Sequence, residues 1–235
     1  MHNFYYLGDF SYYSTYIIFI LPALLISLLA QAWVKSAFSK YSKRFSPLSG
    51  AEAARRVLEL NGVHNVRIER ISGSLTDHFD PTANVIRLSD DVYDSRTIAA
   101  VGVAAHEAGH AVQHATDYSP IKVRNAILPI CNFGSRISFP LILIGLILGF
   151  SELAYIGIIL FSTVLLFQLV TLPVEFNASR RAITVIRNYN LLTDERDVAG
   201  ARRVLTAAAT TYVAAVITSL AQLLRLLVLI SRRRD

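Results

Sequence analysis

Four long apolar stretches constrain this chain more than any other feature. They cover residues 15–34, 137–149, 153–174 and about 205–230, and the first contains no charged residue. A helix of about 20 apolar residues is long enough to cross the hydrocarbon core of a bilayer. A soluble protein can bury one such helix in its core, but a chain of 235 residues cannot bury four. The pattern therefore predicts a multi-pass α-helical membrane protein.

The order of these stretches divides the chain into five expected segments. The polar break at 150–152 predicts a tight hairpin whose first arm begins near Leu128. The first stretch has no Lys or Arg before it and no small-residue cleavage site after it, so we expect an uncleaved anchor. The segments are an anchor at 1–34, an α+β segment at 35–127, a two-span hairpin at 128–174, a helical segment at 175–204, and a C-terminal transmembrane or interfacial helix at 205–235.

The basic residues predict which side of the membrane each segment faces, because Lys and Arg accumulate on the cytoplasmic side. Six arginines lie within 175–204, whereas the hairpin turn has none. The basic residues that follow the first stretch are Lys35, Lys40, Lys43 and Arg44. We therefore expect a protein of the cytoplasmic (inner) membrane whose two polar segments face the cytoplasm. The arginines at 232–234 conflict with an outward C-terminus, so residues 205–230 either cross the membrane or lie along its inner interface.

The net charge of +6 follows from these membrane-flanking residues. No nucleic-acid-binding motif accompanies it, so the lipid bilayer is an expected partner and nucleic acid is not. The single cysteine, Cys131, cannot form an intrachain disulfide, which fits a reducing compartment. The sequence gives no indication of the oligomeric state.

The segment between the first two spans has the polar content of a small α+β domain. Ser49 and Glu52 have the spacing of a capping box, which predicts a helix over 53–60. Alternating apolar and charged residues predict strands over 65–71 and 84–88, and residues 77–81 are typical of a turn. We expect Ser95 to cap the next helix.

That next helix contains the sequence His106-Glu107-Ala108-Gly109-His110. Histidines four residues apart lie on one helical face, about one turn apart, so both imidazoles can reach one tetrahedral Zn²⁺. The Glu107 carboxylate lies beside them and can take a proton from water. This spacing predicts a catalytic zinc site.

A catalytic zinc needs a third protein ligand. Gln113 and Thr116 occupy the positions where a longer motif of this kind carries Gly and His, and His114 is too far along the helix to share the ion. Glu175 directly follows the third span, on the cytoplasmic side of the membrane, where the histidine helix is also expected. We expect Glu175 to be the ligand, with Asp194 and Glu195 as weaker alternatives.

Three segments resemble the YugP-type membrane zinc metallopeptidases of bacteria: 77–81, 104–114 and 172–182. The likeness covers nearly the whole chain, and a weaker one extends to the HtpX-like and CAAX prenyl endopeptidase gluzincins. It implies a small α+β zincin-like catalytic domain that hydrolyses peptide bonds of protein substrates at the cytoplasmic membrane face. It also implies that His106, His110 and Glu175 bind zinc and that Glu107 is the general base. HtpX-like proteins carry Asp four residues after the glutamate, where this chain has Ser179, so support for a zinc histidine departs from that pattern here.

Such a site also needs a group that stabilises the oxyanion and a surface that holds the peptide. The sequence does not select a single residue or a single reading for either of them. Candidates for stabilising the oxyanion of the transition state are His78, Arg181 and Tyr189. The strand at 84–88 is either an edge strand along which an extended peptide lies, or an edge strand that simply exposes Arg87.

Two other functions fit parts of the sequence. An intramembrane site-2-type zinc protease would hold its metal within the bilayer, but the histidine helix is flanked by charged loops. A membrane scaffold or transporter would merely contain the five-residue sequence, but the internal repeats and broken spans of transporters are not evident. The zinc peptidase is therefore the leading hypothesis.

Overall fold

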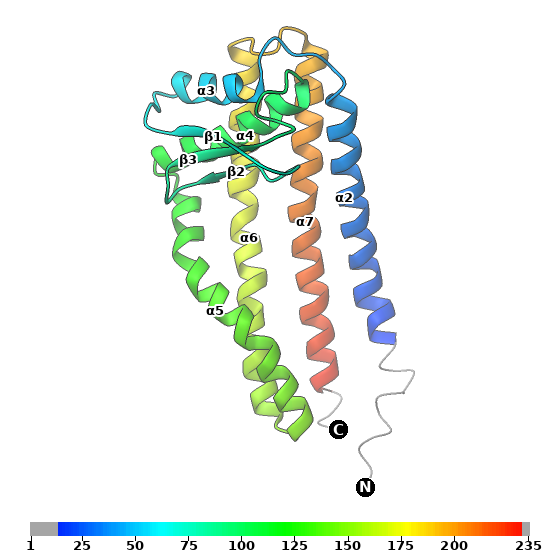
Figure 1. Ribbon diagram of the computed structural model, residues 1–235. Helices are drawn as coiled ribbons and strands as arrows, with labels where there is room; N and C mark the ends of the chain where they lie inside the picture. The colour runs from blue at the N-terminus through cyan, green and yellow to red at the C-terminus, as the bar shows by residue number, and fades with distance from the viewer. Residues whose placement is uncertain (1–13, 232–235) are drawn as a thin grey trace. The chain divides into compact units, whose positions relative to one another are not determined.

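The computed structural model describes residues 14–231 and is mostly helical (Figure 1). The elements in chain order are η2 (Tyr16–Ile20), α2 (Leu21–Tyr41), α3 (Gly50–Leu60), β1 (Arg67–Ile71), β2 (His78–Asp80), β3 (Val85–Ser89), α4 (Ile98–Ala115), α5 (Ser119–Leu148), α6 (Ser151–Asn188) and α7 (Glu195–Ser231). The expected break at 150–152 is confirmed, because α5 ends at Leu148 and α6 begins at Ser151.

The chain packs as two units, each assembled from separate stretches. The apolar unit contains the described residues up to Ala30 together with 123–172 and 211–231. The second unit, which we call the polar unit, contains residues 31–122 and 173–210. Within 14–231, four helical segments are long and apolar enough to cross a membrane: 16–41, 119–148, 151–188 and 195–231. The predicted four apolar helices are thus confirmed.

The apolar unit keeps many large hydrophobic side chains on its surface. Leu29, Ile147 and Ile159 are each about two-thirds or more exposed, at 69%, 72% and 66%. A small buried cluster that includes Ile142, Ile158 and Leu226 packs inside it. Such continuous apolar exposure is costly in water and favourable in lipid.

The sheet of the polar unit has the order β1-β3-β2, with β1 parallel and β2 antiparallel to β3. Two expectations are therefore wrong. Residues 78–80 form β2 rather than part of a turn, and β3 is the central strand rather than an edge. β3 is almost fully buried because it pairs on both sides, and Arg87 forms ion pairs with Asp80 and Glu69 instead of extending freely into solvent. The free edges belong to β1 and β2.

Two helix starts show how local hydrogen bonds set the boundaries. The predicted capping box is present, with Ser49 Oγ accepting from the Glu52 N–H and the Glu52 carboxylate accepting from the Ser49 N–H. In α4 the cap is Thr97 rather than Ser95, because the Thr97 hydroxyl oxygen accepts the Ala100 N–H and leaves Ser95 outside the first turn.

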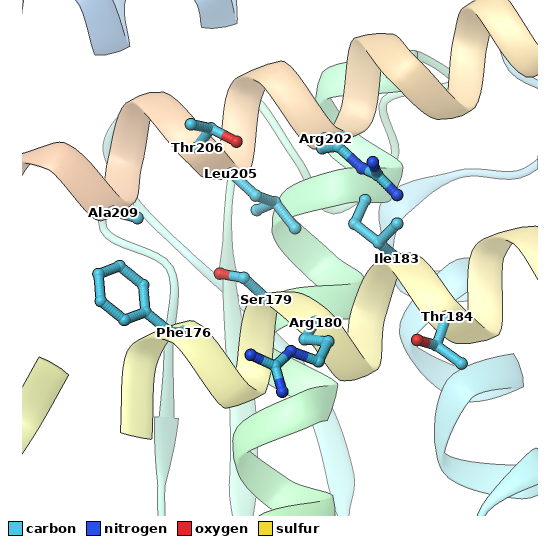
Figure 2. Close-up of a pocket in the computed structure, with 9 residues that line it drawn as sticks. All are labelled: Phe176, Ser179, Arg180, Ile183, Thr184, Arg202, Leu205, Thr206 and Ala209. Carbon is cyan, nitrogen blue, oxygen red and sulfur yellow. The ribbon is translucent and has the colours of Figure 1, made fainter. Parts of the chain in front are cut away.

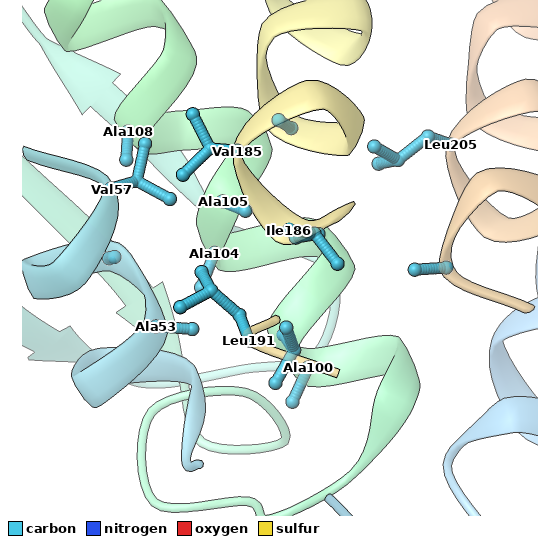
Figure 3. Packing of buried hydrophobic residues seen from close by; sticks show 14 of the residues in the cluster. Ala53, Val57, Ala100, Ala104, Ala105, Ala108, Val185, Ile186, Leu191 and Leu205 are labelled. Atoms are coloured by element: carbon cyan, nitrogen blue, oxygen red, sulfur yellow. The ribbon is translucent and has the colours of Figure 1, made fainter. Parts of the chain in front are cut away.

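The helix α4 brings small side chains of its own into the core of the polar unit (Figure 3). Ala100, Ala104, Ala105 and Ala108 are fully buried, and larger residues from α3 and α6, such as Val57 and Ile186, pack among them. Alanine lets neighbouring helices approach closely while it favours the helical state. The histidine helix is therefore held rigidly between its neighbours.

Candidate metal centre

Three side chains from α4 and α6 converge within the polar unit. His106 Nε2 and His110 Nε2 lie 3.1 Å apart. Glu175 Oε2 lies 3.3 Å from the first of these nitrogens and 3.4 Å from the second. Two stretches of the chain, 65 to 69 positions apart in sequence, thus place three ligand-type atoms at the corners of one small triangle. The other two carboxylates considered from the sequence lie elsewhere, since Asp194 accepts the Arg196 N–H and Glu195 pairs with Arg187.

Gly109 permits this convergence. A Cβ atom at Gly109 would lie 2.8 Å from the Ala178 carbonyl oxygen and 3.3 Å from the Ala178 Cα. Backbone atoms cannot yield to such a contact, so any larger residue would push α4 away from α6. The glycine within the histidine motif therefore brings Glu175 within reach of both imidazoles.

The triangle fits a bound zinc ion. Ligand atoms held about 2.0–2.1 Å from a tetrahedral zinc lie about 3.3 Å from one another, which matches the three observed separations. Glu175 is only 3% exposed, and its Oε2 atom is buried without a hydrogen-bond partner among the described residues. A buried carboxylate oxygen without a partner is costly unless a cation accompanies it. Two histidines and one carboxylate are also the ligand set of many catalytic zinc sites.

Gln113 fixes the orientation of His110. The Gln113 amide nitrogen donates to the Val174 carbonyl and to Asn177 Oδ1, at 2.8 and 3.0 Å. Its Oε1 atom is therefore left to accept a proton from His110 Nδ1, 3.0 Å away. A neutral imidazole that donates from Nδ1 presents a lone pair at Nε2, the atom that faces the triangle. The sequence singled out Gln113 only as a departure from a longer histidine motif, so this role was missed.

Ser179 supports the other imidazole. Its hydroxyl lies 3.1 Å from His106 Nδ1, so this nitrogen also has a polar partner on the side away from the triangle. The sequence suggested that support for a zinc histidine departs from the HtpX-like pattern here. The structure shows that the shorter hydroxyl side chain still reaches His106 because α6 and α4 pack so closely at Gly109.

Negative charge dominates the surroundings of His110. Burial alone would lower the pKa of His110, but the neighbouring carboxylates of Glu175 and Glu107 outweigh it and hold this pKa above its ordinary value. The same field favours a bound metal cation.

Glu107 lies beside the histidines on α4 and is half-buried. Its carboxylate has neither a hydrogen bond nor an ion pair with any residue in the described range. Glu107 follows His106 directly on α4, so its charge is close to the triangle. A carboxylate that is near the site, accessible and uncommitted can exchange a proton with water.

Two of the three candidates for oxyanion stabilisation, His78 and Tyr189, lie away from the triangle. His78 bonds to the Thr76 carbonyl and stands next to Arg87, on the face of the strand opposite Phe79. Phe79 contacts the ring of His114 on α4, which places His78 on the other side of the sheet. Tyr189 is exposed and stands 14 residues after Glu175, about 21 Å along a helix axis.

Arg181, the third candidate, is part of the network behind His110. Its Nε donates to Asn177 Oδ1 at 2.8 Å, and Asn177 in turn accepts from Gln113. Its guanidinium also lies over the ring of Tyr118, 5.9 Å from the ring centre. The structure thus links Arg181 to His110 through two amides rather than by direct contact.

We expect Gln113→Ala to lower zinc affinity about 10- to 100-fold, because His110 loses the acceptor that selects its tautomer. Competition with a fluorescent zinc chelator measures this change in the purified full-length protein. Thr116→Ala is the matched control, since the Thr116 hydroxyl bonds only to the Val112 carbonyl at the other end of the same turn. Equal zinc affinity in Gln113→Ala and Thr116→Ala would contradict the role assigned to Gln113.

Comparisons with known proteins agree with this geometry. Residues 16–231 match the model of a family described as "Putative neutral zinc metallopeptidase". The chain is also similar to a protein of Bacillus subtilis (strain 168) named "Putative membrane protease YugP". The two are 47% identical over 222 residues, which cover 94% of this chain and 98% of that protein. No solved structure matches the chain significantly.

Proposed function

Because this chain belongs to the family of putative neutral zinc metallopeptidases, we propose that it is a zinc-dependent endopeptidase of the gluzincin type, embedded in the cytoplasmic membrane. Its substrates are proteins or peptides at the cytoplasmic face. The observation that carries the proposal is the convergence of His106, His110 and Glu175 beside an uncommitted Glu107. The proposed zinc ligands are these three residues, and Glu107 is the general base.

The chemistry divides between the ion and the chain. A zinc ion bound by the three ligands would acidify a water molecule and polarise the scissile carbonyl. Glu107 accepts one proton from the attacking water and delivers it to the amine that leaves when the C–N bond breaks. Gln113 and Ser179 hold the two imidazoles in place throughout. The water oxygen thus adds to the carbonyl carbon, and the products are an amine and a carboxylic acid, which releases the second water proton to solvent and becomes a carboxylate.

The sheet supports an extended peptide as the substrate. β2 pairs only with β3 among the described strands, so its other edge can accept hydrogen bonds from a bound peptide. β2 also packs against α4 through the contact between Phe79 and His114. We propose β2, in place of the strand first expected, as the docking edge.

The membrane location is supported by the surface of the apolar unit and by the curated relative. Large hydrophobic side chains such as Ile147 are exposed, as expected of a surface in contact with lipid. The similar protein of Bacillus subtilis is named a putative membrane protease. The arginines within 175–204 support the proposed cytoplasmic orientation, because basic residues accumulate on that side of the membrane. The triangle belongs to the polar unit that carries the sheet, which favours this function over an intramembrane protease.

Metal removal tests the proposal. We expect the full-length protein, purified in detergent, to contain a single zinc ion per chain and to cleave casein. Dialysis against 1,10-phenanthroline should abolish cleavage, and adding back zinc should restore it. Measuring zinc by mass spectrometry alongside casein cleavage checks both points. Cleavage that persists in zinc-free protein would refute the proposed function.

A further inference from the structure

A groove of about 310 Å³ lies between α6 and α7 within the polar unit (Figure 2). Its lining includes Ser179, Arg180 and Ile183 from α6, and Arg202, Leu205 and Ala209 from α7. This volume is at the lower end of small-molecule sites. The groove therefore has room for a polar headgroup and the first part of an apolar chain.

The groove carries two unpaired positive charges. Arg180 and Arg202 are exposed, and neither has a hydrogen bond or ion pair with another residue of the described range. Several other arginines of the polar unit are paired with carboxylates, as in the pairs of Arg96 with Glu52 and Arg187 with Glu195. Among the described residues that line the groove, none carries a carboxylate. Two guanidinium groups on one groove, neither of them paired with a carboxylate of the described residues, favour a phosphate-type anion.

Polarity changes along the length of the groove. Phe176 and Ala209 line one end, whereas Arg202 and Thr184 line the other (Figure 2). The apolar end is formed by the residues nearest in sequence to the apolar stretches, since the polar unit begins at Pro173 on α6 and ends at Thr210 on α7. This polarity matches that of an anionic phospholipid, with its headgroup toward the arginines and its acyl chain toward Phe176.

Ser179 shows that the groove is distinct from the proposed zinc site. Ser179 lines the groove, and its hydroxyl contacts His106 at Nδ1. The metal-facing atom of the same imidazole is Nε2, on the other side of the ring. An occupant of the groove therefore lies behind His106, where a scissile peptide bond would not be attacked. This position argues for a ligand other than the substrate.

We propose that this groove binds one anionic phospholipid. Arg180 and Arg202 hold the phosphate, and Phe176, Leu205 and Ala209 contact the start of an acyl chain. The inference rests on the membrane location in the proposed function but not on peptidase activity. A failure of lipid binding would leave the zinc site intact, and a failure of catalysis would leave the groove intact.

The test titrates purified full-length protein in detergent with short-chain phosphatidylglycerol and follows Tm, because a ligand that binds the folded state raises Tm. We expect phosphatidylglycerol to raise Tm and short-chain phosphatidylcholine to have little effect. The double variant R180Q/R202Q should weaken phosphatidylglycerol binding about 25-fold, at about five-fold for each arginine. The control R55Q/R196Q removes the same charge from exposed arginines outside the groove and should bind as the unmodified protein does.

A second variant tests the apolar part without changing charge. Thr206 lines the groove and is exposed, so Thr206→Trp fills the groove with little risk to the fold. We expect it to weaken phosphatidylglycerol binding as well. The proposal is overturned if both lipids raise Tm equally, or if R180Q/R202Q binds like the control. It is also overturned if inorganic phosphate or an acidic peptide raises Tm as much as phosphatidylglycerol and Thr206→Trp leaves that effect unchanged.

Discussion

Replacing Glu107 with glutamine is expected to lower kcat for peptide cleavage about 10³- to 10⁴-fold while zinc remains bound. The amide has nearly the same shape as the carboxylate but cannot accept the proton that the attacking water gives up. Zinc should stay because Glu107 is not a corner of the triangle formed by His106, His110 and Glu175. Single-substrate kinetics and zinc content, measured on the same preparation, check both halves of the expectation.

Glu59→Gln is the matched control for this experiment. Glu59 is an exposed carboxylate on α3, with only a 3.9 Å ion pair to Arg56, so its loss should leave kcat unchanged. Cleavage that survives Glu107→Gln would remove Glu107 from the mechanism. Loss of zinc together with activity would instead make Glu107 a structural part of the metal site.

The two histidines were predictable because helical geometry is local. Any helix through His106 and His110 places both imidazoles on one face, whatever the rest of the chain does. Glu175 needed more, since nothing local places it near α4; its position at the expected cytoplasmic end of the third span predicted it, and the resemblance of 172–182 to a known family supported that choice. The structure brings it 3.3 Å from His106 Nε2 because Gly109 removes the side chain that would separate the helices.

Gln113 and β2 were missed for a common reason, because each depends on distant partners. The orientation of the Gln113 amide is set by hydrogen bonds to Val174 and Asn177, which stand more than 60 residues later. A strand of three residues such as β2 has too short an apolar alternation to stand out, and it forms because β3 offers it an edge. Placing β3 at the centre of the sheet was likewise beyond local patterns.

Arg180 and Arg202 have one significance in the sequence and a second one in the structure. Along the sequence, Arg180 and Arg202 contribute only to the expected cytoplasmic side of the membrane. They are 22 residues apart on different helices, and only the packing of α6 against α7 places both on one groove. The same two arginines therefore support the predicted membrane orientation and form the candidate phosphate site.

Replacing Glu175 with glutamine is expected to abolish the rise in Tm that zinc gives the unmodified protein. The ion would lose an anionic ligand of the triangle, and zinc affinity should fall at least 100-fold, which removes about 2.7 kcal/mol of linked stabilisation. Without zinc, the variant should be at least as stable as the unmodified protein. Its neutral amide relieves a buried carboxylate oxygen that has no hydrogen-bond partner, and it can donate to the imidazole nitrogens.

Glu195→Gln is the matched control for Glu175→Gln. Thermal unfolding is followed with and without zinc for the unmodified protein, Glu175→Gln and Glu195→Gln. Glu195 was the other glutamate considered as a ligand, and its carboxylate pairs with Arg187 instead, so Glu195→Gln should keep the full response to zinc. If Glu175→Gln responds to zinc as strongly as Glu195→Gln does, Glu175 is not a ligand and the assignment of the site fails. A response lost only in Glu175→Gln, with zinc-free stability preserved, separates loss of a ligand from loss of the fold.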